Sequence, residues 1–401
     1  MREGWTISTV GKAVRIASGQ VDPMDDATSD LISVGPDNLN SGGGFDRTGL
    51  RTARDLGQIS GKYAFDSNSI LYSKIRPNLN KVALPDFDGI CSADMYPMWV
   101  ADPQHADREF LFYVLTSEPF VSAATSRSFR TGLPKINRED LEAIEVAIPP
   151  LPEQRKIAEI LRTWDQALEK ITALRALNIR RRVWFRTHLF TGKVRLPGFT
   201  GEWREVPLSD VLHEHGSKST GAEEVYSVSV HKGLVNQVEH LGRSFSAANT
   251  DHYNRVLPGD IVYTKSPTGD FPLGIIKQSK IDREVIVSPL YGVFTPQTYA
   301  LGVILDALFE SPLAARNYLH PLVQKGAKNT IAVTNRQFLE GKIRLPMDPV
   351  EQAAIADIVN ASHVECAGIE AEIEALTRQK RGLMQKLLTG EWRVNSEKVL
   401  A

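Results

Sequence analysis

The stretch that decides the fold is PPLPEQRKIAEIL at residues 149–161, because a diverged copy, MDPVEQAAIADIV, returns at residues 347–359. Glu153 and Glu351 are 198 positions apart, and Gly192 and Gly390 are separated by the same 198 positions. A constant register of this kind, with an anchor at the start of each half, predicts a chain made of two tandem units. The pairs that match at this offset are Trp5 with Trp203, Asn137-Arg138 with Asn335-Arg336, Leu141-Glu142 with Leu339-Glu340, Glu153-Gln154 with Glu351-Gln352, and Thr191-Gly192 with Thr389-Gly390.

Each copy opens a segment with the periodicity of a long helix, which we predict over residues 153–190 and 351–388. Prolines precede Glu153, and proline is tolerated before a helix or in its first turn. Gly192 and Gly390 are placed to end the two helices. In the second segment the spacing alternates between four and three throughout, which is the heptad pattern of coiled-coil packing. Its seam is Ile355, Val359, Ser362, Cys366, Ile369, Ile373, Leu376, Lys380, Leu383 and Leu387.

An apolar stripe on a helix needs a partner. For one such helix, packing against its own domain would be the favoured interpretation. Two helices of equal length at equivalent places in a duplicated chain instead favour packing against each other. A pseudo-two-fold arrangement makes that pair antiparallel, with one globular unit at each end. The predicted fold is therefore α+β, a pseudo-two-fold tandem repeat with two globular domains separated by a pair of long antiparallel coiled-coil helices.

The segments outside the two helices have mixed character. Short apolar runs at residues 70–72 and 260–263 are typical of strands, and segments 107–118 and 301–311 have helical spacing. We predict a globular domain over residues 1–148, a helical region over 149–192, a second globular domain over 193–346, a second helical region over 347–392 and a tail over 393–401.

Composition places the chain among soluble proteins of the cytoplasm. Apolar residues make up 42% and charged residues 24%, and no run of apolar residues is long enough for a membrane span. The two cysteines, Cys91 and Cys366, suit a reducing compartment. The formal net charge of −1 argues mildly against a nucleic-acid binder, although the charge of a whole chain can hide local basic patches.

Four polar loops are candidates for contact with DNA, because Arg, Lys, Asn, Ser and Thr donate to phosphates and base edges. Residues 73–78 and 264–269 each follow a predicted strand, and residues 125–130 and 325–330 precede the repeated Asn-Arg pair. An isolated loop of this kind is usually a solvated turn, but its recurrence in both halves makes the two interpretations equally good. The candidate residues are Lys74, Arg76, Asn78, Arg127, Arg130, Lys265, Thr268, Lys325, Lys328 and Asn329.

Motifs that carry catalysis are missing from the sequence, so no catalytic or metal residue is predicted. There is no Gly-x-Ser-x-Gly elbow, His-Glu-x-x-His pair, phosphate-binding loop or Asn-Pro-Pro-Tyr-type methyltransferase motif. His213 and His215 are more simply an ordinary pair than metal ligands. The basic run of Arg180, Arg181 and Arg182 with Arg186 is either a solvated helix face or a contact for phosphate or a partner.

At this point the residues show a resemblance. The segment at 148–161 resembles the start of the repeated helix in specificity subunits of type I restriction-modification systems. Leu189-Phe190-Thr191-Gly192 and Leu387-Leu388-Thr389-Gly390 resemble the ends of those helices, and residues 197–203 resemble the entry to the second recognition domain. The second copy departs from the pattern, since it keeps Glu351-Gln352 but loses the double proline, which leaves the start of that helix less sharply defined.

The resemblance implies a role as well as a fold. Each globular domain would be a target recognition domain, and the chain would read a bipartite site in double-stranded DNA with the helices as spacer. Two methyltransferase subunits would dock on the helices, with Glu153, Gln154, Glu351 and Gln352 as the expected partner-binding residues. Those subunits would carry adenosylmethionine, so no cofactor is expected on this chain. Restriction subunits would join for cleavage.

Two alternatives remain open. The chain could be a structural adaptor whose coiled coil joins two protein-binding domains, which would give no sequence preference on DNA. It could also be an unrecognised enzyme, which would have a pocket with convergent polar groups in only one half.

Overall fold

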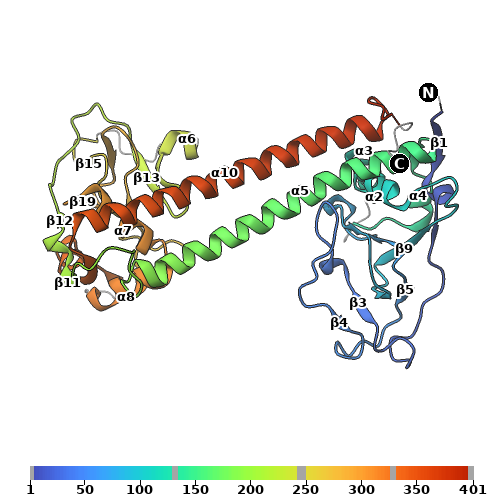
Figure 1. The fold of residues 1–401 in the computed structure, drawn as a ribbon, viewed down its shortest axis with the longest axis horizontal. Helices are drawn as coiled ribbons and strands as arrows, with labels where there is room; N and C mark the ends of the chain where they lie inside the picture. Colours follow the sequence, from blue (N-terminus) through green and yellow to red (C-terminus); the bar gives the residue numbers. More distant parts are fainter. Residues whose placement is uncertain (1–3, 129–133, 242–249, 326–330, 396–401) are drawn as a thin grey trace. The chain divides into compact units, whose positions relative to one another are not determined.

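The computed structural model describes residues 4–128, 134–241, 250–325 and 331–395, and it confirms a mixture of helices and sheets (Figure 1). The chain divides into two compact units. Unit 1 is formed by Met1–Ile171 and Glu372–Ala401, and unit 2 by Thr172–Ala371. Among the helices that the structure describes, none is both long and apolar enough to cross a membrane.

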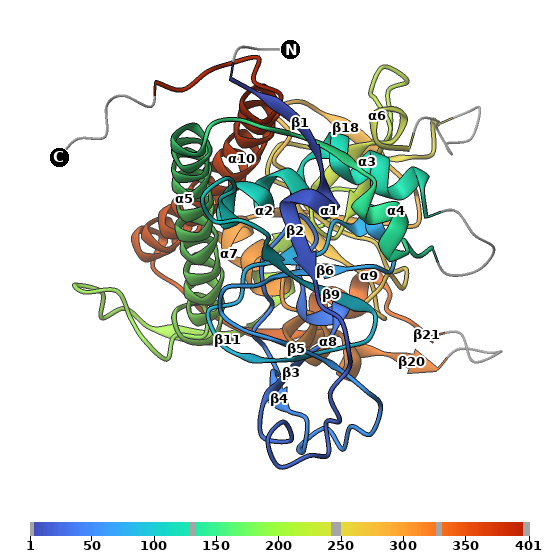
Figure 2. The same ribbon diagram turned by 90° about the vertical axis from the view of Figure 1, so that its right-hand side faces the viewer.

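The described residues of unit 1 form three sheets. In its central sheet the strand order is β2-β9-β6-β7, and the buried strand β6 pairs antiparallel with β9 so that Tyr72 lies opposite Tyr96. Helix α2 packs over this sheet next to the start of α5, since Phe110, Ile70 and Ile157 share one core (Figure 2). Asp107 begins α2 by accepting a hydrogen bond from the Phe110 backbone N–H, as an N-cap residue does.

The strands of unit 1 are β1 (Thr6–Thr9), β2 (Val14–Ile16), β3 (Ile32–Val34), β4 (Arg51–Thr52), β5 (Tyr63–Phe65), β6 (Ile70–Ser73), β7 (Val82–Ala83), β8 (Gly89–Cys91), β9 (Met95–Val100) and β10 (Glu145–Ile148). Its helices are α1 (Val10–Ala13), α2 (Arg108–Thr116), α3 (Glu118–Ser126), α4 (Arg138–Glu142) and the first part of α5 (Leu151–Trp184). The last part of α10 (Pro349–Leu388) completes the unit.

Unit 2 repeats the central sheet and one strand pair of this topology, but the four-stranded sheet β4-β3-β8-β5 has no four-stranded counterpart among the described residues. Its central sheet has the order β12-β19-β16-β17, and the pair β11-β22 matches the pair β1-β10 of unit 1. The strands are β11 (Trp203–Pro207), β12 (Leu212–His213), β13 (Tyr226–Ser229), β14 (Gly233–Asn236), β15 (Asn254–Val256), β16 (Ile261–Tyr263), β17 (Ile276–Gln278), β18 (Val285–Val287), β19 (Gly292–Pro296), β20 (Gln324–Lys325), β21 (Ile331–Ala332) and β22 (Lys342–Pro346). The helices are α6 (Gln237–Leu241), α7 (Tyr299–Phe309), α8 (Pro312–Leu319) and α9 (Asn335–Glu340).

The two long helices each contribute to both units. In unit 1, the start of α5 shares a core with the end of α10, through Ile157 and Leu387 among others. In unit 2, the start of α10 shares a core with the residues that follow α5, through Val359 and Phe190 among others. Within each unit, residues later in α5 contact residues earlier in α10, so the two helix segments run antiparallel.

Charged pairs border both helix contacts. Lys380 donates to Asp165 in unit 1. In unit 2, Arg181 pairs with Glu365, and Arg175 Nη2 lies 2.8 Å from Glu370 Oε1. All ten residues of the seam that the sequence predicted on α10 are buried or partly buried. The apolar pattern therefore identifies the correct face of this helix.

The predicted element positions agree closely with the structure. The helix predicted over 153–190 begins at Leu151 and ends in a π-helical turn over Phe185–Leu189, and the helix predicted over 351–388 begins at Pro349. Both start two residues earlier than predicted because proline in a first turn lacks only an N–H that would have no partner there. The predicted strands at 70–72 and 260–263 correspond to β6 and β16.

Candidate nucleic-acid interface

The loop after β6 is held against a segment more than fifty residues later in the chain. The Arg76 backbone N–H donates to the Pro134 carbonyl at 2.8 Å, and the Ile136 N–H donates to the Lys74 carbonyl at 2.9 Å. Ile75 and Lys135 form an isolated β-bridge between these contacts. The loop at 73–78 and the residues before α4 are thereby joined into one surface.

Three cations gather where these segments meet. Lys74 Nζ lies 4.9 Å from the centroid of the Tyr96 ring, and the Arg138 guanidinium lies 5.9 Å from the same centroid. Lys135 is 3.5 Å from Asp94. Burial lowers the pKa of Lys74, and the neighbouring charge of Lys135 lowers it further. Glu142 also acts on Tyr96, so three cations lie with the carboxylates of Asp94 and Glu142, and the excess of one cation favours a positive potential that attracts phosphate.

The exposed candidates of unit 1 flank this cationic cluster. Arg76 is exposed and has a left-handed backbone with φ of 47°, directly before the short helix at Pro77–Leu79. A left-handed conformation is costly for a residue other than glycine, so surrounding contacts must hold it. Asn78 and Arg127 are exposed as well, and Asn78 lines a groove beside α3. Arg130 lies outside the described residues.

Unit 2 places Lys265 where unit 1 has Lys74, immediately after the equivalent strand. Lys265 has a φ of 60°, and burial lowers its pKa while the charge of Glu214 acts in the opposite direction. Asn335 donates a side-chain hydrogen bond to Glu214. Thr268 is exposed in a tight turn in which its backbone exchanges hydrogen bonds with Phe271 at 3.0 and 2.8 Å. The backbone of Lys325 lies in β20, whereas Lys328 and Asn329 lie outside the described residues.

Sequence reasoning missed Lys135 and Arg138 as members of the cluster. The repeated Asn-Arg pair carried the signal for Arg138, but its counterpart Arg336 is 89% exposed and pairs with Glu340 at 2.8 Å. The recurrence therefore marks the start of a helix in each unit, and among the described residues only the copy in unit 1 joins a charged cluster. Asn137 caps α4 by accepting from the Asp140 N–H, and Thr334 caps α9 in the same way.

The residues predicted to bind partners are buried inside their own units. The exposed fractions are 2% for Glu153, 0% for Gln154, 0% for Glu351 and 6% for Gln352. Gln154 Nε2 donates to the carbonyls of His105 and Pro149, each at 2.8 Å. Side chains this buried and this well paired hold their own unit together, so their position does not support the expected contact with another subunit.

Both glutamates sit in the same set of contacts. In unit 1, Glu153 accepts from Trp5 Nε1 at 3.2 Å and from Arg393 Nη2 at 3.0 Å. In unit 2, Glu351 accepts from Trp203 Nε1 at 3.1 Å and from Arg195 Nε at 2.6 Å. A buried carboxylate must be paired to be stable, and in each unit one tryptophan and one arginine provide that pairing.

The basic run near the end of α5 is largely paired within unit 2. Arg181 pairs with Glu365, and Arg182 Nη2 lies 2.9 Å from Glu310 Oε2. Arg186 is 3.6 Å from the same carboxylate oxygen. The run is therefore neither a fully solvated face nor a set of free cations.

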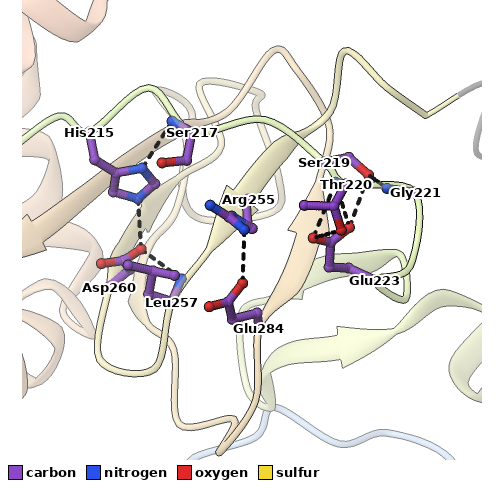
Figure 3. Close-up of polar contacts among 10 residues, drawn as sticks. All are labelled: His215, Ser217, Ser219, Thr220, Gly221, Glu223, Arg255, Leu257, Asp260 and Glu284. Atoms are coloured by element: carbon purple, nitrogen blue, oxygen red, sulfur yellow. Dashed lines mark hydrogen bonds and ion pairs between the residues drawn. The ribbon is translucent and has the colours of Figure 1, made fainter.

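A polar cluster beside β15 in unit 2 includes one of the two histidines considered as metal ligands (Figure 3). The Ser217 N–H donates to His215 Nδ1 at 3.0 Å, which leaves the proton on Nε2, 3.0 Å from Asp260 Oδ2. Asp260 also accepts from the Leu257 N–H and the Thr295 hydroxyl, at 2.8 and 2.7 Å. Both nitrogens of the His215 ring are thus in use, and no group of three possible metal ligands occurs among the described residues. The cluster serves to order its loops.

Comparisons with known proteins give one consistent family. A family model described as the type I restriction modification DNA specificity domain matches residues 34–178. The chain is 36% identical over 203 residues to the type I restriction enzyme EcoDI specificity subunit of Escherichia coli, which is 50% of this chain and 43% of that protein. It is 25% identical over 313 residues to the MjaVIII specificity subunit of Methanocaldococcus jannaschii, which is 72% of this chain and 71% of that protein.

Solved structures show the same fold at low identity. The type I restriction-modification system S subunit from M. genitalium has a TM-score of 0.60 and 16% identity, with 96% of both chains covered. A chain from a study of complex assembly and conformational transition of the type I R-M system has a TM-score of 0.54 and 17% identity, with 98% of this chain and 99% of that chain covered. The resemblance predicted from the sequence is confirmed: the chain is similar to specificity subunits of type I restriction-modification systems, and its match to the EcoDI subunit spans less than half of that protein's length.

Proposed function

We propose that this chain is the DNA-reading subunit of a restriction-modification complex and that each unit reads one part of a bipartite site. The observation that carries the proposal is the cluster of Lys74, Lys135 and Arg138 around Tyr96, which lies within the residues that match the DNA specificity domain. The formal net charge of −1 is compatible with this role because three cations of unit 1 lie together at one place, whatever the charge of the whole chain.

Buried and exposed residues in and beside the cluster have different roles in this proposal. Lys74 is 9% exposed, so it contributes positive charge and supports the loop at residues 73–78 without contacting DNA directly. The exposed side chains of Arg76, Asn78 and Arg127 reach the DNA, and Arg130 is a further candidate from the sequence. In unit 2 the corresponding candidates are Lys265, Thr268, Lys325, Lys328 and Asn329. Different side chains on a shared sheet topology would give the two units different base preferences.

The two long helices would set the spacer between the half-sites and carry the partner subunits. The proposed docking surface lies on α5, where Leu174, Leu177 and Trp184 share one face and are 45%, 55% and 44% exposed. Large apolar side chains exposed together on a helix are typical of an interface, and tryptophan is enriched at the centre of such sites. This surface replaces the buried Glu-Gln pairs as the proposed contact for methyltransferase subunits.

Catalysis would belong to the partners. Two methyltransferase subunits would hold adenosylmethionine and flip the target adenine out of the duplex, because the atom to be methylated is out of reach inside it. Restriction subunits would join the same complex in the cytoplasm. This chain would position the duplex and contribute no cofactor.

The experiment is a genome-wide map of methylated adenines in cells that express an active methyltransferase subunit with or without this chain. A split motif that appears only with the chain would support the proposal and reveal both half-sites. Substituting Lys74 and Arg76 by Ala should disturb one half of the motif, and substituting Lys265 and Lys328 should disturb the other. No new motif with an active methyltransferase would favour the adaptor interpretation.

A further inference from the structure

Unit 2 contains a basic cavity that none of the predicted DNA-contacting loops lines. Its volume is about 240 Å³, well above the roughly 30 Å³ that one water occupies in the liquid. The walls come from the turn between β13 and β14, from β17 and the residues after it, from α7 and from the two long helices. All of the lining residues belong to unit 2.

Cations outnumber anions in this cavity. The cationic side chains that line it are Arg182, Lys232, Lys277 and Lys280, and the carboxylates are Asp306 and Glu310. Each carboxylate forms an ion pair with at least one of these cations. Lys277 and Lys280 lie 3.7 and 3.2 Å from Asp306, and Arg182 lies 2.9 Å from Glu310. Lys232 forms no ion pair among the described residues and is exposed at the rim.

The cations that line the cavity lower the pKa of the partly buried carboxyl group of Glu310. Burial raises the pKa of Glu310, but the hydrogen bond from His363 and the charges of Lys277 and Arg182 hold it at about 2. Lys277 is itself 8% exposed at its side chain. The positive potential at the cavity wall therefore outweighs the desolvation of this acid.

Two hydrogen-bonding atoms of residues that line the cavity, Gln278 Oε1 and His363 Nδ1, are buried without a partner among the described residues. His363 lines the cavity, and its Nε2 lies 3.1 Å from Glu310 Oε1. Its Nδ1 is buried and has no hydrogen-bond partner among the described residues. A buried nitrogen in this state is costly unless a ligand or water supplies the missing contact.

Unit 1 lacks the equivalent arrangement. At the offset of 198 residues, Arg182 corresponds to Lys380 and His363 corresponds to Asp165. Lys380 donates to Asp165, and the hydroxyl of Tyr113 donates to the same carboxylate at 2.7 Å. At these equivalent positions of unit 1 one cation meets one anion, so the described residues there show no excess of positive charge.

We infer that this cavity binds a phosphate group. Lysine and arginine side chains that converge on one space provide the donors that phosphate oxygens accept. A phosphate monoester carries a charge of about −1.5 to −2 at pH 7, which matches four cations facing two carboxylates.

The test is calorimetric titration of the full chain with inorganic phosphate at constant ionic strength, with sodium chloride as the blank. Saturable binding is expected for the unaltered chain. The double variant Lys232→Gln and Lys280→Gln should weaken binding at least tenfold, since both side chains line the cavity and neither is buried. Lys342→Gln, an exposed lysine on β22, is the matched control and should bind as the unaltered chain does. Equal affinity in the double variant and the control, or no saturable binding in any of them, overturns the inference.

A competition arm identifies the source of the phosphate. A nucleoside monophosphate that displaces inorganic phosphate would mark the cavity as a site for free nucleotides. A duplex oligonucleotide without terminal phosphates that displaces it would mark a contact with the nucleic-acid backbone. If neither competes while the double variant has lost binding, the natural ligand is free phosphate. The proposed DNA reading by unit 1 does not change in any of these outcomes, so the two proposals fail separately.

Discussion

Arg195 and Arg393 are equivalent residues that close the two units in the same way. Arg195 follows α5 and donates to Glu351 at the start of α10, whereas Arg393 follows α10 and donates to Glu153 at the start of α5. Each glutamate also accepts a hydrogen bond from a tryptophan of its own unit, Glu153 from Trp5 and Glu351 from Trp203. The residue after each helix thus secures the beginning of the other one.

Removing Arg393 should destabilise unit 1. The loss of one partner from a fully buried pair costs about 3–5 kcal/mol, but the Arg393 side chain is 50% exposed, so we expect about 1–2 kcal/mol for Arg393→Ala. Arg195→Ala should cost more, because that side chain is 27% exposed. Chemical unfolding of both variants measures the difference. Equal stability of Arg195→Ala and the unaltered chain would contradict the role of this contact.

Substitution of Arg76 separates two kinds of DNA contact. If Arg76 binds a phosphate, Arg76→Ala should lower the slope of log affinity against log salt by about 0.9, with base preference unchanged. If it reads a base edge, the variant should lose about 1–3 kcal/mol and relax one position of the half-site. Binding titrations at several salt concentrations on matched and mismatched duplexes distinguish the two. Arg51→Ala, an exposed arginine on β4, should leave both quantities unchanged.

Stability in acid should depend on Glu310. Its pKa is about 2 in the folded chain against an ordinary value of 4.5, so its contribution is complete above pH 4.5 and is lost as the pH falls toward 2. The shift corresponds to at most about 3 kcal/mol. Glu310→Gln should remove this part of the pH dependence, as followed by thermal unfolding between pH 2 and 5. Glu118→Gln, an exposed carboxylate of unit 1, is the control, and the prediction fails if both variants retain the same pH profile.

The exposed apolar face of α5 should matter for assembly and little for folding. Trp184 is 44% exposed and stacks on His188 with ring centroids 4.9 Å apart. Trp184→Ala should weaken binding to the methyltransferase subunit by about 2 kcal/mol, roughly thirtyfold, because tryptophan anchors often dominate interfaces. Ile179→Ala is the matched control, since Ile179 is 45% exposed on another side of the helix. Co-purification and titration of the two subunits give the measurement, and equal losses in both variants would argue against this surface.

The duplication and its helices could be predicted from the sequence because they depend on periodicity and on residues that recur at one offset. The alternating apolar positions from Ile355 to Leu387 specify a helix face directly. The cationic cluster could be predicted only in part. Lys74 follows a recognisable strand, but Lys135 reaches it through a bridge between Ile75 and Lys135 that no local pattern indicates.

The sequence identified the two Glu-Gln pairs as important residues but did not indicate their role. Glu153 and Glu351 recur, are charged and begin a helix, which are properties of a docking residue as much as of a buried one. Their burial depends on Trp5 and Arg393, and on Trp203 and Arg195, which meet them only in the folded chain. Sequence recurrence thus identified important residues without showing whether the reason was structure or binding.

The division of the long helices between the units also orders events during synthesis. Unit 2 is one uninterrupted segment, Thr172–Ala371, and a growing chain has all of it before residue 372 is added. Unit 1 must wait for Leu387, Leu388 and Arg393 to pack against Ile157 and Glu153. Domains usually fold in the order in which they leave the ribosome. In this protein the unit that is begun first is completed after the other one, and the part of its apolar surface that Leu387 and Leu388 cover stays exposed until those residues have been added.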